Sequence, residues 1–312
     1  MPRILGKLLG SADKDKADIV LLGSIARRES TVASDCDYFV LQHGASPITT
    51  RQLIRAARRA RESTGLNKPG AQGVFGEVVI AANLYECIGL DVDSNANMTR
   101  RILLLTESES VWGNARRNVI DNILSRYCAD YLPPERSGDS PARIPRYLLN
   151  DLIRFWRTMA VDFGTKRWRT NNDESYLRLA KLRITRKVLF AGPLATLLLV
   201  PKRTRTTGEL QEYLTKWLNI PPLAQLASVT ELVSDRSKDA MKQLLVQYDR
   251  FIDLISDDKR RDILGARCDK NGHHNMLKDE CRSIGDTVEK SLETLFWDDD
   301  LFYEMLRSYA VF

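Results

Sequence analysis

The chain has 312 residues, of which 43% are hydrophobic and 28% are charged, a composition typical of soluble globular proteins. This length allows two domains, or one domain with a helical extension. Lysine and arginine total 47 against 41 aspartates and glutamates, so the net charge is +6 and the isoelectric point is near 9.0. A modest positive charge is compatible with a nucleic-acid partner or a nucleotide substrate.

The sequence gives no sign of a membrane-spanning or secreted protein. The longest apolar run, 188–200, contains Gly192 and Pro193 and is too short to cross a bilayer. The N-terminus lacks the apolar core and the small-residue cleavage site of a signal peptide. Five cysteines without regular spacing fit a reducing cytoplasm better than a disulfide scaffold. We therefore expect a cytoplasmic protein with no membrane partner.

The first part of the chain alternates short apolar runs with helical patterns. The run 19–22 (IVLL) predicts a buried strand that ends at Gly23 and Ser24. Glycine lets the backbone approach an anion closely, and a helix that starts there offers free N–H groups to a phosphate. The sequence therefore predicts a phosphate-binding turn at the end of this strand.

The most informative residues are two acids, Asp35 and Asp37, at the start of the next strand. Side chains alternate along a strand, so these two carboxylates share one face while Cys36 points into the fold. Carboxylates placed in this way can hold Mg²⁺, which prefers oxygen ligands and keeps waters and nucleotide phosphates as further ligands. The alternative is that both are ordinary acids at a strand entry.

Two helices and one more strand follow in this first part. Residues 49–64 (TTRQLIRAARRAREST) predict a helix whose arginines cover more than one face, which favours a solvated surface over a dedicated RNA contact. After a turn-rich connection, residues 73–80 predict a strand that contains Glu77. Residues 97–107 predict a helix that reaches Glu107.

The clearest linker is 133–141 (PPERSGDSP), where three prolines and a glycine leave little that could pack. Beyond it, apolar residues recur near the helical period. We expect an α+β protein with a small mixed-sheet domain over residues 1–132 and an all-helical domain over 142–312. The helices of the second domain are expected at 147–168, 177–199 with an interruption at Gly192 and Pro193, 207–218, 222–234, 239–256 and 283–309.

The order of strand, Gly-Ser, helix, Asp-x-Asp and strand in LLGSIARRESTVASDCDYFVL resembles the nucleotidyltransferase superfamily of the DNA polymerase β type. The segments LLLTESESVWG, DLIRFWRTMAVDFGTKRW and KLRITRKVLFAG are similar to the bacterial branch related to PII-protein uridylyltransferases. The resemblance covers most of residues 15–200. It implies transfer of a nucleoside monophosphate from an NTP at a two-metal site that uses Mg²⁺ or Mn²⁺, with the helical domain closing the nucleotide and acceptor cleft.

The resemblance also implies roles for particular residues. Asp35 and Asp37 would be catalytic metal ligands, and a third carboxylate from a neighbouring strand is expected at Glu77. Glu107 is the second candidate for that third carboxylate. Gly23 and Ser24 would hold the NTP phosphates.

Basic residues at the ends of two predicted helices would neutralise the departing pyrophosphate. The candidates are Lys166 and Lys181, followed by Arg183. The alternative is that these charges complement the helix dipole or lie on a solvated face.

The acceptor hydroxyl is the least determined part of the prediction. Positive charge and a helical extension favour the 3′ end of a tRNA or another RNA, as in tRNA-modifying nucleotidyltransferase toxins that inhibit translation. Such a protein would have a cognate antitoxin as a partner. The alternatives are uridylylation or AMPylation of a protein hydroxyl, adenylylation of an antibiotic, and synthesis of a signalling oligonucleotide.

Cysteine and histidine side chains gather in the segment CDKNGHHNMLKDEC. Thiolates and imidazoles of this kind can form a tetrahedral zinc site. The spacing matches no standard zinc signature, so a polar loop is favoured and no zinc site is predicted. The four residues concerned are Cys268, His273, His274 and Cys281.

Overall fold

The structure is a computed structural model. It describes residues 2–9, 14–31, 34–44, 50–69, 74–129, 143–170, 176–265 and 276–310, without the side chains of residues 2, 6 and 166–170. The predicted linker, 133–141, lies outside these ranges. The protein is α+β, with a small four-stranded mixed sheet and many helices, as the sequence predicts.

The chain divides into two compact units. The first unit consists of Met1–Asp151 and Thr204–Pro221, and the second consists of Leu152–Arg203 and Pro222–Phe312. The first unit is therefore built from two separate stretches of sequence. The predicted domains, 1–132 and 142–312, stay a prediction, and each unit is described here by itself.

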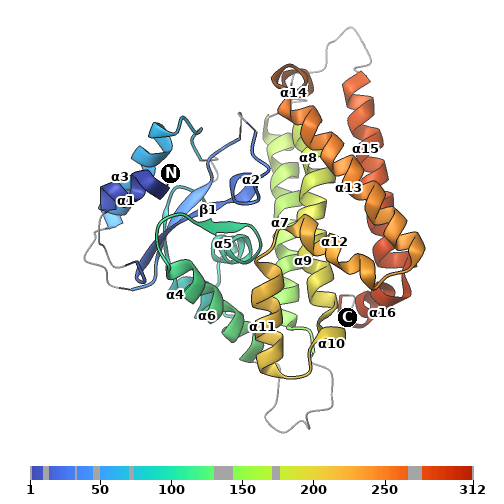
Figure 1. Cartoon of the computed structure of the whole chain (residues 1–312), viewed down its shortest axis with the longest axis horizontal. Coiled ribbons are helices and arrows are strands. Elements are labelled where there is room, and N and C mark those ends of the chain that lie inside the picture. The colour runs from blue at the N-terminus through green and yellow to red at the C-terminus, as the bar shows by residue number, and fades with distance from the viewer. Residues whose placement is uncertain are drawn as a thin grey trace. The chain divides into compact units, whose positions relative to one another are not determined.

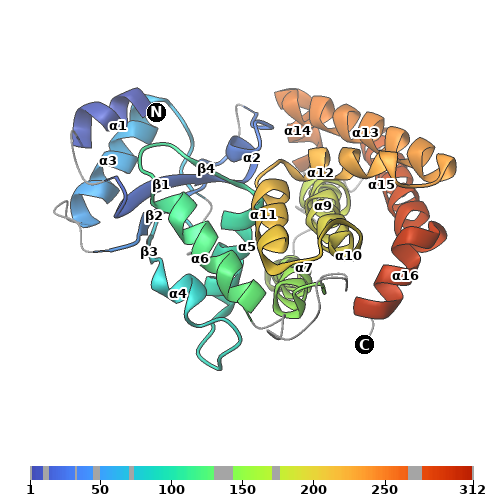
Figure 2. The same cartoon turned by 60° about the horizontal axis from the view of Figure 1, so that its bottom comes forward.

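The first unit combines the sheet with helices on both of its faces (Figures 1 and 2). Helix α7 (Arg146–Thr170) begins in this unit and continues into the second. The other elements in chain order are α1 (Pro2–Leu9), β1 (Ala17–Leu22), α2 (Gly23–Ala26), β2 (Tyr38–Gln42), α3 (Thr50–Ser63), β3 (Val78–Ile80), α4 (Ala82–Tyr85), α5 (Asn95–Thr106), β4 (Ser108–Ser110), α6 (Ala115–Ala129) and α11 (Thr207–Leu218).

The strand order in the sheet is β3-β2-β1-β4. Strand β1 runs antiparallel to both β2 and β4, whereas β3 runs parallel to β2. Leu21 pairs with Tyr38, so the end of β1 lies beside the start of β2. All six residues of β1 are buried, because helices cover both faces of the sheet.

The core of the first unit lies on both sides of this sheet. Helices α1 and α3 cover one face, and α5 and α6 lie on the other (Figures 1 and 2). The apolar cluster beneath α1 and α3 draws on alternate strand residues, as expected for strands. Its members include Leu5, Ile19, Leu21, Cys36, Tyr38, Val40, Leu53 and Ala57.

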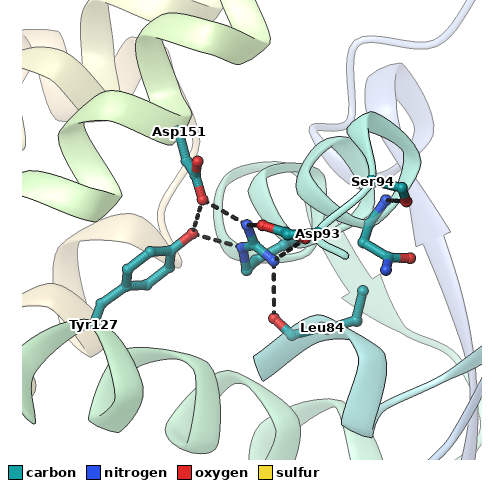
Figure 3. A network of polar contacts seen from close by, with 7 residues as sticks. Leu84, Asp93, Ser94, Tyr127 and Asp151 are labelled. Carbon is teal, nitrogen blue, oxygen red and sulfur yellow. Dashed lines mark hydrogen bonds and ion pairs between the residues drawn. The ribbon is translucent and has the colours of Figure 1, made fainter. Parts of the chain in front are cut away.

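A buried polar network joins α4, α5, α6 and the first part of α7 (Figure 3). Arg101 on α5 is fully buried, and its guanidinium donates to Asp93 at 2.7 Å and Asp151 at 2.5 Å. The same guanidinium donates to the Tyr127 hydroxyl at 2.6 Å and to the Leu84 carbonyl at 3.2 Å. Because Asp151 lies at the start of α7 and Tyr127 lies on α6, one arginine ties four segments together.

The second unit is helical throughout its described residues. No helix in the described ranges of either unit is both long and apolar enough to cross a bilayer. Besides the rest of α7, the elements of the second unit are α8 (Tyr176–Lys181), a π-helical turn (Leu182–Arg186), α9 (Lys187–Leu198), α10 (Val200–Arg203), α12 (Pro222–Ser228), a 3-10 turn (Val229–Glu231), α13 (Asp235–Ser256), α14 (Asp258–Gly265), α15 (Met276–Glu293), a second π-helical turn (Thr294–Asp298) and α16 (Asp300–Tyr309).

The predicted interruption at Gly192 and Pro193 is wrong, because α9 runs through both residues. A Cβ on Gly192 would lie 2.4 Å from the carbonyl oxygen of Pro222, which is too close for any side chain. The glycine therefore lets α12 approach α9, and it does not end the helix. The irregular turn lies earlier, at Leu182–Arg186.

Candidate functional site

The Gly-Ser turn lies where β1 ends. Gly23 has φ +62°, a left-handed conformation that glycine adopts without steric cost. The Leu22 N–H donates to the carbonyl of Asp37 at 2.9 Å, so the turn and the entry to β2 are held side by side. A Cβ on Gly23 would be 3.7 Å from Asp37 Oδ2. The Asp37 carboxylate therefore lies against the backbone of the turn.

The residues ahead of β2 alternate in burial as predicted. Cys36 is fully buried in the core, Asp35 is exposed and Asp37 is half-buried. The segment is fixed by a bridge between Asp35 and Asn67 and by the Cys36 N–H, which donates to the Asn67 carbonyl at 3.4 Å. Burial, and then the charge of Asp37, raises the pKa of the Cys36 thiol to about 11. Cys36 therefore stays protonated at neutral pH and is a packing residue.

Glu77 lies directly before β3, which is shorter than the strand predicted over 73–80. Its side chain is exposed, and its carbonyl accepts the N–H of Val40 at 2.9 Å. This bond places Glu77 next to β2, as expected for a neighbouring strand. Within the described ranges, no three His, Cys, Asp or Glu side chains form a group that could hold a metal ion. The role of Glu77 as a third ligand stays a prediction.

Glu107 lies on the other side of the turn and is buried. Its carbonyl accepts the N–H of Gly23 at 3.1 Å, while its carboxylate accepts a hydrogen bond from Arg27 Nη1. Arg27 Nε donates to Glu29 Oε2 at 2.9 Å. We call these three residues, Arg27, Glu29 and Glu107, the Arg27 clamp. The clamp joins α2 to the start of β4 and leaves the Glu107 carboxylate paired.

Arg27 and Glu29 were not identified from the sequence. The charges in the segment ARRES, between the Gly-Ser turn and the two aspartates, are the only local signal for them. Nothing in that segment indicates a partner 80 residues away, the separation of Arg27 and Glu107.

The predicted phosphate-binding cations belong to the second unit. The Arg183 guanidinium donates to Asp286 at 2.7 Å and to Glu289 at 3.0 Å, and these hydrogen bonds raise its pKa. Arg183 is therefore paired with acids of α15. Lys181 is half-buried at the end of α8, and the side chain of Lys166 lies outside the described residues. Joint action of these cations with the turn at Gly23 stays a prediction.

The Cys-His segment is described only in part. Cys268, His273 and His274 lie outside the described residues. Cys281 lies on α15 as a buried free thiol, and burial raises its pKa to about 11. A protonated, buried thiol is typical of a packing residue.

Asp37 beside the turn and Asp35 two residues before it are residues of the kind that Mg²⁺ prefers, because both carry carboxylate oxygens. This ion is usually bound through one or two carboxylates, keeps several waters and takes further oxygens from substrate phosphates. An exposed Asp35 and a half-buried Asp37 supply carboxylates of this kind.

Comparison of the sequence with models of known protein families gave no match, and neither did comparison with curated proteins.

Proposed function

We propose that this protein is a Mg²⁺-dependent nucleotidyltransferase that moves a nucleoside monophosphate from an NTP to the 3′ hydroxyl of an RNA. The observation that carries the proposal is the Asp37 carboxylate against the Gly23 turn, where the end of β1 meets the start of β2. Asp35 supports it, because the burial of Cys36 leaves both acids outside the core.

In the proposed reaction, the acceptor oxygen attacks the α-phosphorus of the NTP. The bond from that phosphorus to the β-phosphate oxygen breaks, pyrophosphate leaves, and the hydroxyl proton passes to water. Asp35 and Asp37 would hold Mg²⁺, which neutralises phosphate charge and lowers the pKa of the acceptor hydroxyl. Gly23 keeps the space beside Asp37 free of a side chain, and the Arg27 clamp fixes the turn through the Gly23 N–H.

The exposed arginines of α3 lie on a solvated surface, as the sequence predicts, and their lack of acidic partners among the described residues supports an RNA acceptor. Four arginines of this helix are exposed, and within the described residues none of them pairs with a carboxylate. A row of unpaired guanidiniums attracts a phosphate backbone and repels a cationic antibiotic. The four residues are Arg51, Arg55, Arg58 and Arg59.

A nucleotide added to the 3′ end of tRNA would block aminoacylation, so the proposal includes a toxin-like effect on translation. The α+β first unit would then be the transferase part of the chain.

The test is incubation of the full chain with Mg²⁺, total tRNA and each α-labelled NTP. Label should enter the RNA, and the Asp35→Asn, Asp37→Asn double variant should lose roughly 10²–10³-fold or more in rate. Asp91→Asn, a change at an exposed aspartate, is the matched control and should keep full activity. Label in a protein instead of RNA would contradict the acceptor, and equal activity of the double variant would contradict the site.

A second measurement addresses α3. Replacing its four exposed arginines with glutamine should raise the KM for RNA and flatten the dependence of KM on salt, because phosphate contacts release counterions. The KM for the NTP should not change. An unchanged KM for RNA would remove α3 from the proposal.

A further inference from the structure

A cavity of about 310 Å³ lies within the first unit, and neither Asp35 nor Asp37 lines it. Three stretches of chain form its walls: the end of α2 with Arg27 and Arg28, the junction of α5 and β4, and the end of α11. Arg116 on α6 completes it. Figure 2 shows α2, β4, α6 and α11, the elements that contribute these walls.

The guanidinium of Arg116 is held by neutral partners. Its Nε donates to Ser108 Oγ at 2.6 Å and its Nη2 donates to Asn219 Oδ1 at 2.7 Å. No carboxylate of the described residues lies within ion-pair distance of it. Burial lowers the pKa of Arg116, and the more distant charges of Glu109 and Asp18 raise it again only in part. A desolvated cation without a direct counterion is costly, and a bound anion would remove that cost.

Arg28 provides a second cation with an unusual backbone. Its φ is +62°, and it is the only non-glycine residue of the described chain with a positive φ. Such conformations are uncommon for residues with a Cβ and cost about 1–3 kcal/mol, and they cluster at functional sites. The Arg28 side chain is exposed and lines the same cavity.

The rest of the lining determines the kind of ligand. Three arginines and two glutamates line the cavity, but Arg27 and Glu107 pair with each other. Arg28 and Arg116 therefore face a single remaining acid, the exposed Glu109. The apolar part of the lining is formed by Leu105, Leu218, Ile220 and Pro221.

We propose that this cavity is a binding site for a small phosphate-bearing anion. The phosphate lies between Arg116 and Arg28, because the planar guanidinium matches phosphate oxygens in geometry and charge. If the ligand has a carbon skeleton attached to the phosphate, that skeleton lies against the apolar residues of the lining. Both a free phosphate ion and the phosphate of a nucleoside monophosphate have this chemistry. The site does not depend on the proposed transferase activity, because the two proposed metal ligands, Asp35 and Asp37, do not line it.

The test measures binding without Mg²⁺ in the full-length Asp35→Asn, Asp37→Asn variant, so that nucleotide bound through metal does not contribute. Isothermal titration is carried out with inorganic phosphate, pyrophosphate and each nucleoside monophosphate. In this background, Arg116→Met should weaken binding about 10- to 100-fold, the loss expected for a charged hydrogen bond. Arg117→Met, a change at the exposed neighbour on α6, should leave binding unchanged.

Asn219→Asp separates loss of the ligand from loss of the fold. It places a carboxylate on Arg116 Nη2, so the arginine gains a counterion and the anion meets a competitor. Binding should weaken at least about tenfold, while a native helical circular-dichroism spectrum and cooperative unfolding show that the variant is folded. Undiminished binding in this variant would overturn the proposal.

The ligand series separates the two sources of phosphate. Binding of phosphate and pyrophosphate alone identifies a free-anion site, whereas tighter binding of monophosphates identifies a nucleotide site. No binding of any probe at millimolar concentration overturns the proposal, and so does equal weakening by Arg117→Met. If the native chain binds phosphate but transfers no nucleotide, the transferase proposal fails and this one stands.

Discussion

Replacing Arg101 with methionine should remove a large part of the stability of the first unit. The side chains of Arg101, Asp93 and Asp151 are 0%, 2% and 5% exposed, so the variant strands two carboxylates in the interior. Loss of one partner from a buried ion pair costs about 3–5 kcal/mol. Methionine fills much of the vacated space, so the charge accounts for most of the loss. The cost is a substantial share of the roughly 5–15 kcal/mol that stabilises a typical domain.

Urea unfolding at pH 7.5 measures this loss. Arg55→Met, the same change at an exposed arginine of α3, should stay within about 0.5 kcal/mol of the native chain. Adding Asp151→Asn to Arg101→Met removes one stranded charge, so the double variant should recover about 1–3 kcal/mol. A loss below about 1 kcal/mol for the single variant, or a double variant no more stable than the single one, would refute this account of the network.

Three further changes test other parts of the fold by urea unfolding. Glu107→Gln leaves Arg27 with one fewer carboxylate and should cost about 1–3 kcal/mol; no loss would show that the clamp is not stabilising. Burial raises the pKa of Asp299, but hydrogen bonds from nearby serines lower it more, so the net shift is downward. Its stabilisation is therefore present above about pH 4 and is lost as the pH falls further. Asp299→Asn should cost about 1–3 kcal/mol at pH 7 and much less at pH 2.5; an equal cost at both would contradict this. Gly192→Ala should cost at least about 1–3 kcal/mol through overpacking, whereas Gly208→Ala, with open space around it, should cost nothing. Equal effects of the two glycine changes would contradict the close approach at α9.

Elements with strong local signals could be predicted from the sequence. The run IVLL gives β1, and the predicted helix over 207–218 coincides with α11. The start of α11 is sharp because Thr206 and Glu209 form a capping box, a local feature that fixes the first turn. The alternation of Asp35, Cys36 and Asp37 is local as well, so the burial of Cys36 could be predicted.

Features that depend on distant partners could not be predicted. The partners of Arg101 lie 8, 26 and 50 residues away, and no periodicity in the sequence indicates them. Gly192 and Pro193 have the composition of a helix break, but α12 packs against α9 at that point and tertiary packing outweighs local propensity. The cavity at Arg116 likewise depends on α11, which lies about a hundred residues further along the chain.

The two-part first unit affects how this protein can be synthesised. Leu210, Leu214 and Leu218 of α11 are buried, and Gln211 donates to the Ser125 hydroxyl of α6 at 2.9 Å. A growing polypeptide cannot cover this side of α6 until the ribosome has passed Pro221. A recombinant fragment that stops at residue 132 would expose this apolar surface of α6 to solvent, and we expect such a fragment to aggregate.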